Sequence, residues 1–377
     1  MEIKISVICM HAVDVVIIRS SPDKYDGRVQ KIARTLSKKF TVAILSWDRE
    51  GKLKHIEKIE QNLWAKRFKF RAPYKKVHLA LYLPFFWLWV LSNLFALKPR
   101  IVHACDLDTV IPSFIYKVLT RAKLVFDSFD KYAIMVSRYG ILSKIVEIVE
   151  NILAYKSDAL IVASKDRLST YGKFLPKFVE VIMNCPDDSL IRHSEQKPEP
   201  KIEKKTDELV LVYAGTISRD RGLLILKEAI KGLKDVRLVI AGRDVDGTLK
   251  ELIREPNVQY VGILPYEDVL RLEMQADVVP VLYDPREPIN RMANPNKLFE
   301  AMMLGKPVIT NVCRDIISEC KCGLITEYNV KSVRKAVLLL KSNNVLRKKL
   351  GEAGYYAFKR KYNWRYMEKK LFKLYEN

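Results

Sequence analysis

Cysteine is scarce in this sequence, with six residues in a chain of 377. So few cysteines do not suggest a disulfide framework. Cys320 and Cys322 form a C-x-C pair, but no second pair and no nearby histidine completes a zinc-binding set, so we interpret both as buried thiols. The compartment expected from this usage is a reducing one, the cytoplasm.

Three other signals are missing. Residues 1–10 hold one lysine and a short apolar run, without the long apolar segment or cleavage site of a signal peptide, so we expect a buried strand there. The sequence has no internal repeat of about 20–50 residues, which argues against repeat architectures. The full dinucleotide-binding pattern G-x-G-x-x-G directly after a strand is also missing.

Acidic residues are outnumbered, with 44 Asp and Glu against 66 Lys and Arg, a formal net charge of +22. Such an excess is typical of a protein that meets nucleic acid, an anionic membrane or phosphorylated substrates. No recognised nucleic-acid-binding module accompanies it, so we expect no specific nucleic-acid partner. With 49% hydrophobic residues, the chain is a folding one of a length that suits two domains.

The first half alternates short apolar strands with helical patterns, which predicts a parallel sheet covered on both faces. An amphipathic helix is predicted over residues 27–39. The predicted strands cover residues 3–10, 40–47, 100–106, 122–130 and 158–164. We expect this N-terminal domain to span residues 1–188.

The same alternation restarts after a polar, proline-containing segment, residues 189–207, that we predict to be a linker. A second Rossmann-like domain is expected over 208–360, and a C-terminal helix, 361–377, is expected to pack back on the first domain. The predicted strands cover residues 209–215, 236–242, 258–264, 276–283 and 307–312. The fold class is therefore α/β, with two doubly wound domains facing a cleft.

Ligands of such sheets bind beyond the carboxyl ends of the strands, so the loops there are informative. Gly215 ends one predicted strand and is followed by Arg219 and Arg221, while Gly242 and Arg243 end another. Glycine lets the backbone approach a phosphate, and guanidinium groups supply positive charge. A solvated loop with incidental arginines is an equally good interpretation of these residues alone.

Two acidic pairs, Asp106 with Asp108 and Asp244 with Asp246, resemble the D-x-D pattern that holds a metal with a nucleotide diphosphate. We interpret both as coincidences of three letters and expect no metal.

The stretch NPNKLFEAMMLGKPVIT, residues 294–310, predicts a helix from Pro295 to Leu304 with Asn294 as its cap. Lys297 lies in the first turn, which is unfavourable for a cation unless an anion binds there. Glu300 lies on the same face, where a carboxylate is well suited to bind the two hydroxyls of a ribose. The alternative is a local Lys–Glu ion pair.

The second domain resembles the sugar-nucleotide domain of retaining GT-B-fold glycosyltransferases, the family-four or glycosyl transferases group one proteins. The resemblance covers nearly the whole chain and is strongest from about Leu209 to Thr326. Its carriers are YAGTISRDRGLLIL, VIAGRD, VQYVGILPYEDVLRLEMQADVVPVLY and NPNKLFEAMMLGKPVI. It implies transfer of a sugar from a nucleotide-diphosphate sugar, UDP- or GDP-linked, with retention of configuration, no cofactor and no metal.

The resemblance also implies roles for individual residues. Glu300 would bind the ribose, and Arg221 and Lys297 would stabilise the leaving diphosphate. Asp106, Asp127 and Asp130 follow strands of the first sheet and could orient or deprotonate the acceptor, although each is equally interpretable as a loop residue. The predicted catalytic set is Asp106, Asp127, Asp130, Arg221 and Lys297, and the predicted donor-binding set is Gly215, Thr216, Arg219, Arg221, Gly242, Arg243, Leu264, Asn296, Lys297, Leu298 and Glu300.

Three positions depart from the family pattern. Met292 stands where an earlier glutamate is frequent, and Thr216 where arginine is common, which makes Arg219 the candidate substitute. Phe129 stands where many members have histidine, and His103 is expected to pack beneath the site. These departures leave a catalytically idle scaffold of a glycosylation complex as an alternative, beside an epimerase or a phosphorylase of the same fold.

The segment from Trp64 to Leu97 interleaves basic and aromatic residues and continues into 19 uncharged residues, 79–97. We expect it to contain a core helix with a membrane-facing side, bound to an anionic surface, rather than a spanning helix. The resulting prediction is a peripheral protein on the cytoplasmic face of a membrane, with a glycan or lipid-linked acceptor.

Overall fold

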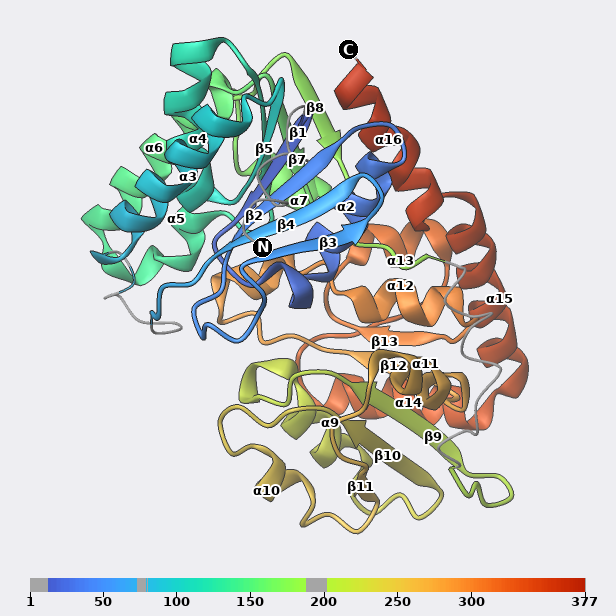
Figure 1. Cartoon of the computed structure of the whole chain (residues 1–377). Helices are drawn as coiled ribbons and strands as arrows, with labels where there is room; N and C mark the ends of the chain where they lie inside the picture. Colours follow the sequence, from blue (N-terminus) through green and yellow to red (C-terminus); the bar gives the residue numbers. More distant parts are fainter. Residues whose placement is uncertain (1–12, 73–78, 80, 188–201, 377) are drawn as a thin grey trace. The chain divides into compact units, whose positions relative to one another are not determined.

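The computed structural model describes residues 13–72, 79, 81–187 and 202–376 (Figure 1). It contains two compact units, which we call the N-terminal unit, Met1–Ile182 with Glu368–Asn377, and the C-terminal unit, Met183–Met367. The predicted limits at 188 and 208 differ from this division, because Met183 already belongs to the C-terminal unit. The predicted linker, 189–207, lies largely outside the described residues, and the predicted cleft between the domains stays a prediction.

The N-terminal unit is built on an eight-stranded sheet in the order β3-β4-β2-β1-β5-β6-β7-β8. Neighbouring strands are parallel except β3, which runs antiparallel to β4. The strands are β1 (Val15–Arg19), β2 (Val42–Trp47), β3 (Ile56–Glu60), β4 (Leu63–Phe68), β5 (Ile101–Cys105), β6 (Lys123–Ser128), β7 (Ala159–Val162) and β8 (Phe178–Val181). The α-helices are α2 (Gly27–Ser37), α3 (Leu83–Leu97), α4 (Leu107–Thr120), α5 (Tyr132–Met135), α6 (Ile141–Lys156) and α7 (Lys165–Ser169).

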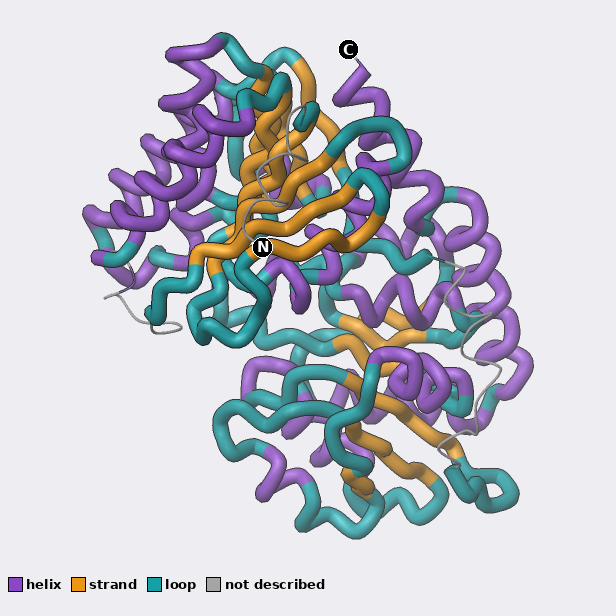
Figure 2. Tube along the Cα trace, viewed as in Figure 1, coloured by secondary structure: helices purple, strands orange, loops and turns teal. Residues whose placement is uncertain are grey.

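Helices cover both faces of this sheet (Figure 2). Because side chains alternate along a strand, Val16 and Ile18 of β1 enter a core that also contains Phe86 of α3, Val110 of α4 and Leu153 of α6. Strands buried on both faces need continuous apolar sequence, which is why their runs could be recognised.

The strands predicted at 40–47, 100–106, 122–130 and 158–164 are confirmed as β2, β5, β6 and β7. The strand predicted at 3–10 lies outside the described residues. Strand β1, which pairs with both β2 and β5, was not predicted. Its sequence VVIIR directly follows another short apolar region, and such runs carry no periodicity that would separate them.

The segment predicted to face a membrane, 64–97, divides into parts. Residues 64–68 belong to β4, where Arg67 is 1% exposed and forms ion pairs with Asp23 and Glu57 at 2.7 and 2.6 Å. The prediction is therefore wrong for Arg67, because a guanidinium buried in ion pairs cannot meet lipid. Residues 73–78 and 80 lie outside the described residues. In the described part of the chain, no helix has both the length and the apolar character that crossing a bilayer requires.

The C-terminal unit contains two three-stranded parallel sheets, β11-β10-β9 and β12-β13-β14. A parallel bridge between Leu211 and Val278 connects them beside β9. The combined order β11-β10-β9-β12-β13-β14 is that of a doubly wound Rossmann domain, with its switch point between β9 and β12. The strands are β9 (Leu209–Ala214), β10 (Val236–Ala241), β11 (Val258–Tyr260), β12 (Val279–Val281), β13 (Val308–Thr310) and β14 (Gly323–Ile325).

The five strands predicted for the second domain are confirmed as β9 to β13. The α-helices are α9 (Leu223–Ile230), α10 (Leu249–Leu252), α11 (Tyr266–Met274), α12 (Asn296–Met303), α13 (Arg314–Cys320), α14 (Val330–Ser342), α15 (Asn344–Arg360) and α16 (Trp364–Glu376). The predicted C-terminal helix begins at Trp364, and from Glu368 onward it belongs to the N-terminal unit, where the Tyr375 hydroxyl lies at Nδ1 of His103. Cys322 is buried, whereas Cys320 is only half-buried because it ends α13.

Candidate functional site

Two glycine turns meet at the carboxyl ends of β9 and β10. Gly215 has φ +143° and Gly242 has φ +136°, backbone angles that residues other than glycine rarely adopt. A Cβ on Gly242 would come within 1.8 Å of the carbonyl oxygen of Gly215. The two turns therefore pack backbone on backbone, and only glycine at position 242 permits this approach.

The ammonium group of Lys297, on α12, lies over the first of these turns. A Cβ on Gly215 would meet Lys297 Nζ at 2.5 Å, and Nζ lies 4.7 Å from the ring centroid of Tyr213. Burial disfavours the charge, but the pKa of Lys297 is raised above its usual value by Tyr213 and Tyr283 and by the carboxylates of Glu300 and Glu273. Lys297 thus presents a stable positive charge at the end of β9.

Glu300 lies one turn further along α12 and is 5% exposed. Its Oε1 accepts a hydrogen bond of 2.8 Å from the hydroxyl of Tyr266, the first residue of α11. Glu273, at the other end of α11, is fully buried, and neither of its carboxyl oxygens has a hydrogen-bond partner among the residues that the structure describes. Burial and the charge of Glu300 raise the pKa of Glu273 well above its usual value, against the opposing effect of Lys297.

A second cation lies at the same strand ends. The guanidinium of Arg221 lies 4.6 Å from the ring centroid of Tyr283, which follows β12. Asn311, which follows β13, holds Tyr283 in place through hydrogen bonds of 2.9 and 2.7 Å to its backbone N–H and C=O. The structure thus brings Gly215, Arg221, Lys297 and Glu300 to the switch point of the sheet.

The other predicted donor residues lie at the rim or in the core. Arg219 is directed away, since its side chain is 71% exposed and lies 3.8 Å from Glu251. Thr216, Arg243 and Asn296 are exposed, Leu264 is half-buried, and Leu298 is fully buried, so only the backbone of Leu298 could face a ligand.

The start of α12 differs from the prediction. The helix begins at Asn296, and its N-cap position is occupied by Pro295, with no side-chain cap. Asn294 was predicted as the cap, but its Oδ1 instead lies 3.9 Å from the Sγ of Cys313. An uncapped helix start retains free N–H groups, which favours an anion there.

The Asp244–Asp246 pair is engaged by its own loop and by the loop that contains Arg219. Asp244 Oδ1 accepts the backbone N–H of Gly247 at 3.0 Å, and the two oxygens of Asp246 accept from Thr248 and from the N–H of Arg219. No group of three or more His, Cys, Asp or Glu residues that could hold a metal ion occurs among the described residues.

Asp106 is the most unusual of the residues predicted for the acceptor side. It follows β5 with φ +70° and ψ 167°, a conformation found almost only in glycine. Its carboxylate forms an ion pair with Arg19 and accepts a hydrogen bond of 2.8 Å from the N–H of Phe129. Burial raises its pKa to about 7, with Arg19 opposing and Asp108 adding to the rise.

Asp127 has a different environment. It is fully buried and accepts two hydrogen bonds, 3.0 and 2.7 Å, from the guanidinium of Arg28, with His103 Nε2 at 3.3 Å. Although burial opposes it, Arg28 and His103 lower the pKa of Asp127. The prediction that Asp127 acts on an acceptor hydroxyl is therefore corrected: its side chain has no exposed surface, so an acceptor cannot reach it. His103 is buried beneath it, as expected.

Phe129 and Asp130 complete this cluster. The Phe129 ring contacts two guanidinium groups, with its centroid 4.4 Å from Arg19 and 5.0 Å from Arg28. Asp130 is partly exposed and pairs with Arg167 at 2.6 Å. Arg19 and Arg28 were not predicted; Arg19 could have been found as the charged end of the apolar run VVIIR.

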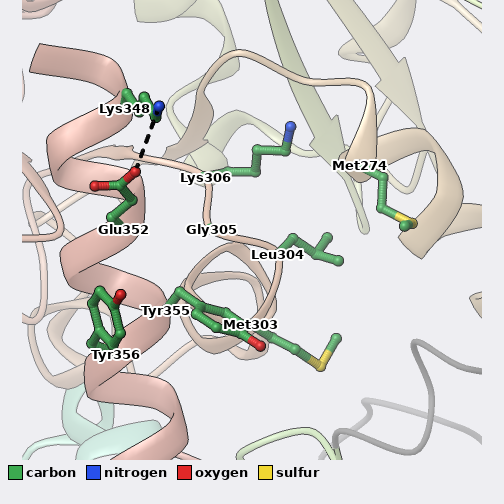
Figure 3. Close-up of a pocket in the computed structure, with 9 residues that line it drawn as sticks. All are labelled: Met274, Met303, Leu304, Gly305, Lys306, Lys348, Glu352, Tyr355 and Tyr356. Atoms are coloured by element: carbon green, nitrogen blue, oxygen red, sulfur yellow. Dashed lines mark ion pairs between the residues drawn. The ribbon is translucent and has the colours of Figure 1, made fainter. Parts of the chain in front are cut away.

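A separate cavity of about 500 Å³ lies between the ends of α11 and α12 and the helix α15 (Figure 3). Met274, Met303 and Tyr355 line it, and Lys348 lies 4.0 Å from Glu352 at its edge. None of the predicted site residues lines this cavity, so we do not assign it to the predicted donor site.

Comparisons with known proteins agree on family and fold. Residues 208–343 match the model of the family described as Glycosyl transferases group 1. A protein of Bacillus subtilis (strain 168), named for teichuronic acid biosynthesis as glycosyltransferase TuaH, is 26% identical over 221 residues. That match covers 54% of this chain and 55% of TuaH, so it spans about half the length of the relative.

Two solved structures resemble the chain over nearly its full length. Sucrose-phosphate synthase from Thermosynechococcus elongatus has a TM-score of 0.78 at 14% identity, covering 96% of this chain and 98% of its own. Anabaena HepE in complex with UDP and glucose has a TM-score of 0.71 at 13% identity, covering 97% and 100%. These likenesses confirm the α/β class with two Rossmann-like domains, the GT-B fold, and within that fold residues 208–343 are the part that matches the glycosyl transferases group 1 model.

Proposed function

We propose that this protein transfers a sugar from a UDP-sugar to a glycan or lipid-linked acceptor, with retention of configuration and without a metal. The observation that carries the proposal is the placement of Lys297 against Gly215, with Arg221 at the same strand ends and Glu300 one helical turn away. A diphosphate beside two cations and a ribose beside a carboxylate match this arrangement in charge and order.

Each part of the donor has a group suited to it. The diphosphate lies at the Gly215 turn, with Lys297 and Arg221 as its counter-charges. Glu300, held by Tyr266, accepts hydrogen bonds from the ribose hydroxyls. The loops at Gly242–Arg243 and Leu264 surround the base. UDP is our choice of nucleotide because the HepE structure that shares the fold contains it.

The chemistry follows from these charges. The bond between the anomeric carbon and the diphosphate oxygen breaks, and the acceptor oxygen forms its bond to that carbon on the same face. The electron pair leaves with UDP, whose added negative charge is stabilised by Lys297 and Arg221. The acceptor loses its proton to a base, for which Asp106 is our candidate because its side chain keeps 8% exposure, whereas Asp127 has none, and because its pKa of about 7 suits proton transfer near neutral pH.

We also propose that the protein works at the cytoplasmic face of a membrane. Support comes from the formal charge of +22 and from α3, whose Phe85 and Leu88 are exposed while Phe86 and Val90 are buried. A helix with this division packs on its own domain and keeps an apolar side for an interface.

The first test is calorimetric titration of the purified protein with UDP, GDP, ADP and CMP. Saturable UDP binding that Glu300→Ala weakens at least about tenfold, and that the exposed control Glu352→Ala leaves unchanged, supports the donor site. Tighter binding of GDP than of UDP would correct the choice of nucleotide but would still support the donor site. If a folded sample binds no nucleotide, the donor site is wrong and a non-catalytic scaffold becomes the better interpretation.

A second test follows turnover of UDP-glucose and related donors with candidate acceptors. Release of UDP with an α-linked product from an α-linked donor supports retention, and unchanged rates in EDTA support metal independence. Interconversion of UDP-sugars without an acceptor would identify an epimerase, and sugar-phosphate formation from a glycan and inorganic phosphate would identify a phosphorylase.

A further inference from the structure

Exposed apolar side chains are concentrated in one part of the N-terminal unit. Among the described residues, 31 large apolar side chains are exposed, and 16 of them lie within residues 81–155. Soluble surfaces usually scatter such residues singly, whereas a gathered patch marks a contact with another molecule or a membrane. This stretch therefore needs an explanation beyond folding.

Helix α6 carries the centre of the patch. Its exposed apolar residues recur every three or four positions, so they form one stripe on a helix that buries only Glu150, Leu153 and Ala154. The stripe consists of Ile141, Leu142, Ile145, Ile148, Val149, Ile152 and Tyr155. The most exposed of these is Ile141, at 77%.

The neighbouring helices extend the patch. Helix α4 packs against both α3 and α6, and the three lie side by side along one face of the eight-stranded sheet (Figure 1). Their exposed apolar residues are Phe85, Leu88 and Phe95 on α3 and Ile115, Val118 and Leu119 on α4. The patch is thus a face formed by three helices, much broader than a single seam.

The exposed charges in this stretch of the chain are nearly all positive. In the fully described stretch 81–158, the exposed basic residues are Lys98, Arg100, Arg121, Arg138, Lys144 and Lys156, and Glu147 is the one exposed acidic residue. Exposed apolar side chains with basic residues in the same stretch are complementary to an anionic lipid surface, where apolar groups enter the acyl boundary and cations meet headgroups.

We propose that α3, α4 and α6 form a membrane-binding face that rests on an anionic bilayer, with α6 as its principal contact. Self-association through α6 is less well supported, because its 16 residues provide only about two heptads and a coiled coil needs at least about three. Insertion across the bilayer is not involved, since α6 and its described neighbours lack the length and apolar character for it.

This inference deepens the membrane part of the proposed function by naming its surface, which keeps α3 from the segment predicted at 64–97 and adds α4 and α6. The inference rests on the proposed function only for the reason why the protein would bind a membrane, which is access to a lipid-linked acceptor. Vesicle binding is measured without donor or sugar transfer, so failure of the membrane face and failure of the transferase assignment can be told apart.

The experiment is co-flotation of the full chain with vesicles of pure phosphatidylcholine or of phosphatidylcholine mixed with phosphatidylglycerol. The test variant combines Ile145→Ser, Ile148→Ser and Ile152→Ser. Its matched control combines Leu338→Ser, Leu339→Ser and Val345→Ser, which are exposed apolar residues of the C-terminal unit. A charge variant, Lys144→Glu with Lys156→Glu, is compared with Lys335→Glu and Lys349→Glu, which keep the same net charge. Circular dichroism and melting temperature verify that each variant is folded.

We expect the wild type to float with the anionic vesicles, the triple α6 variant to bind at least about tenfold more weakly, and the C-terminal control to bind as the wild type does. The Lys144/Lys156 variant should also lose affinity, and more so than its control. A folded wild type that ignores anionic vesicles, or an α6 variant that binds normally, overturns the proposal. So does light scattering that shows a dimer which the α6 variant converts to a monomer, with no vesicle binding by either.

Discussion

Lys297 and Gly215 are in direct contact: a Cβ added to the glycine would meet the ammonium nitrogen at 2.5 Å. The lysine therefore lies over the turn that ends β9, and the turn has no side chain because the lysine occupies that space. Tyr213, 4.7 Å below the ammonium, supports it from the strand. In a doubly wound sheet the turn after the first strand is the phosphate-binding position. The contact therefore places the positive charge of Lys297 at the turn where a phosphate is expected.

Gly215→Ala is expected to displace Lys297 and weaken UDP binding at least about tenfold, measured by calorimetry. Because the contact is with the end of a flexible side chain, the protein should still fold, with a loss of about 1 kcal/mol from the φ of +143°. Gly232→Ala is the control, since Gly232 also has a positive φ, +75°, but has open space around it. Equal UDP affinity in both variants would mean that the placement of Lys297 is irrelevant to the nucleotide.

Glu273→Gln is expected to stabilise the protein increasingly as pH rises. The pKa of Glu273 is raised in the folded state by burial and by Glu300, so its stability contribution is complete below the pKa of the unfolded chain and is lost as pH rises through the folded pKa. Within that interval the advantage of the glutamine should grow by about 1.4 kcal/mol per pH unit. Urea unfolding at several pH values measures it.

The exposed Glu352→Gln serves as the control and should stay within about 0.5 kcal/mol of wild type throughout. A Glu273→Gln effect that does not change with pH would show that the buried carboxyl is stabilised equally in both protonation states.

The sequence predicted the parts of the fold that depend on local pattern. Strands such as β2 and β9 are continuous apolar runs between helical segments, and that pattern admits few alternatives. Strands β3 and β4 were missed because IEKIE and LWAKRF alternate polar and apolar residues at an edge of the sheet, so their charges resembled a surface patch. Arg67 shows the consequence, since its partner Asp23 lies 44 residues away.

Residues of the candidate site could be singled out from the sequence where they are unusual among their neighbours in the chain. They could not be singled out where their role depends on contacts between residues far apart in the chain. Gly215 could be found because it directly follows a predicted strand. Lys297 and Glu300 could be found because they are charged residues on an otherwise apolar helix. Tyr266 was missed because its bond to Glu300 joins residues 34 positions apart. Arg28 was missed because its partner, Asp127, is brought to it only by the order of the strands.

Arg28→Met is expected to destabilise the protein by about 3–5 kcal/mol, because it leaves Asp127 buried without its bidentate partner. The double variant Arg28→Met/Asp127→Leu should recover most of this loss, since neither charge then remains unpaired. Lys348→Met, which breaks an exposed pair with Glu352, should change stability by less than about 1 kcal/mol. Denaturant unfolding gives all three values, and a double variant no more stable than Arg28→Met would refute the ion-pair explanation.

The protonation of Asp106 should set the pH dependence of transfer. Its pKa of about 7 is raised by burial and by Asp108 and Asp130, and lowered by Arg19, which also pairs with Asp26 at 2.9 Å. A base must be deprotonated to accept the acceptor proton, so kcat/KM should rise with pH and level off above about 7.

Two variants test this assignment with different readouts. Asp106→Asn should abolish the rising limb together with most of the activity, while UDP affinity stays unchanged because the proposed donor residues belong to the C-terminal unit and Asp106 to the N-terminal unit. Arg19→Gln removes the charge that lowers the pKa of Asp106, so the limb should move to higher pH and not disappear. Arg138→Gln, an exposed arginine of the same unit, should leave the profile in place. A limb that stays near pH 7 in Asp106→Asn would assign the titration to another group, because an asparagine has no proton to lose in this range.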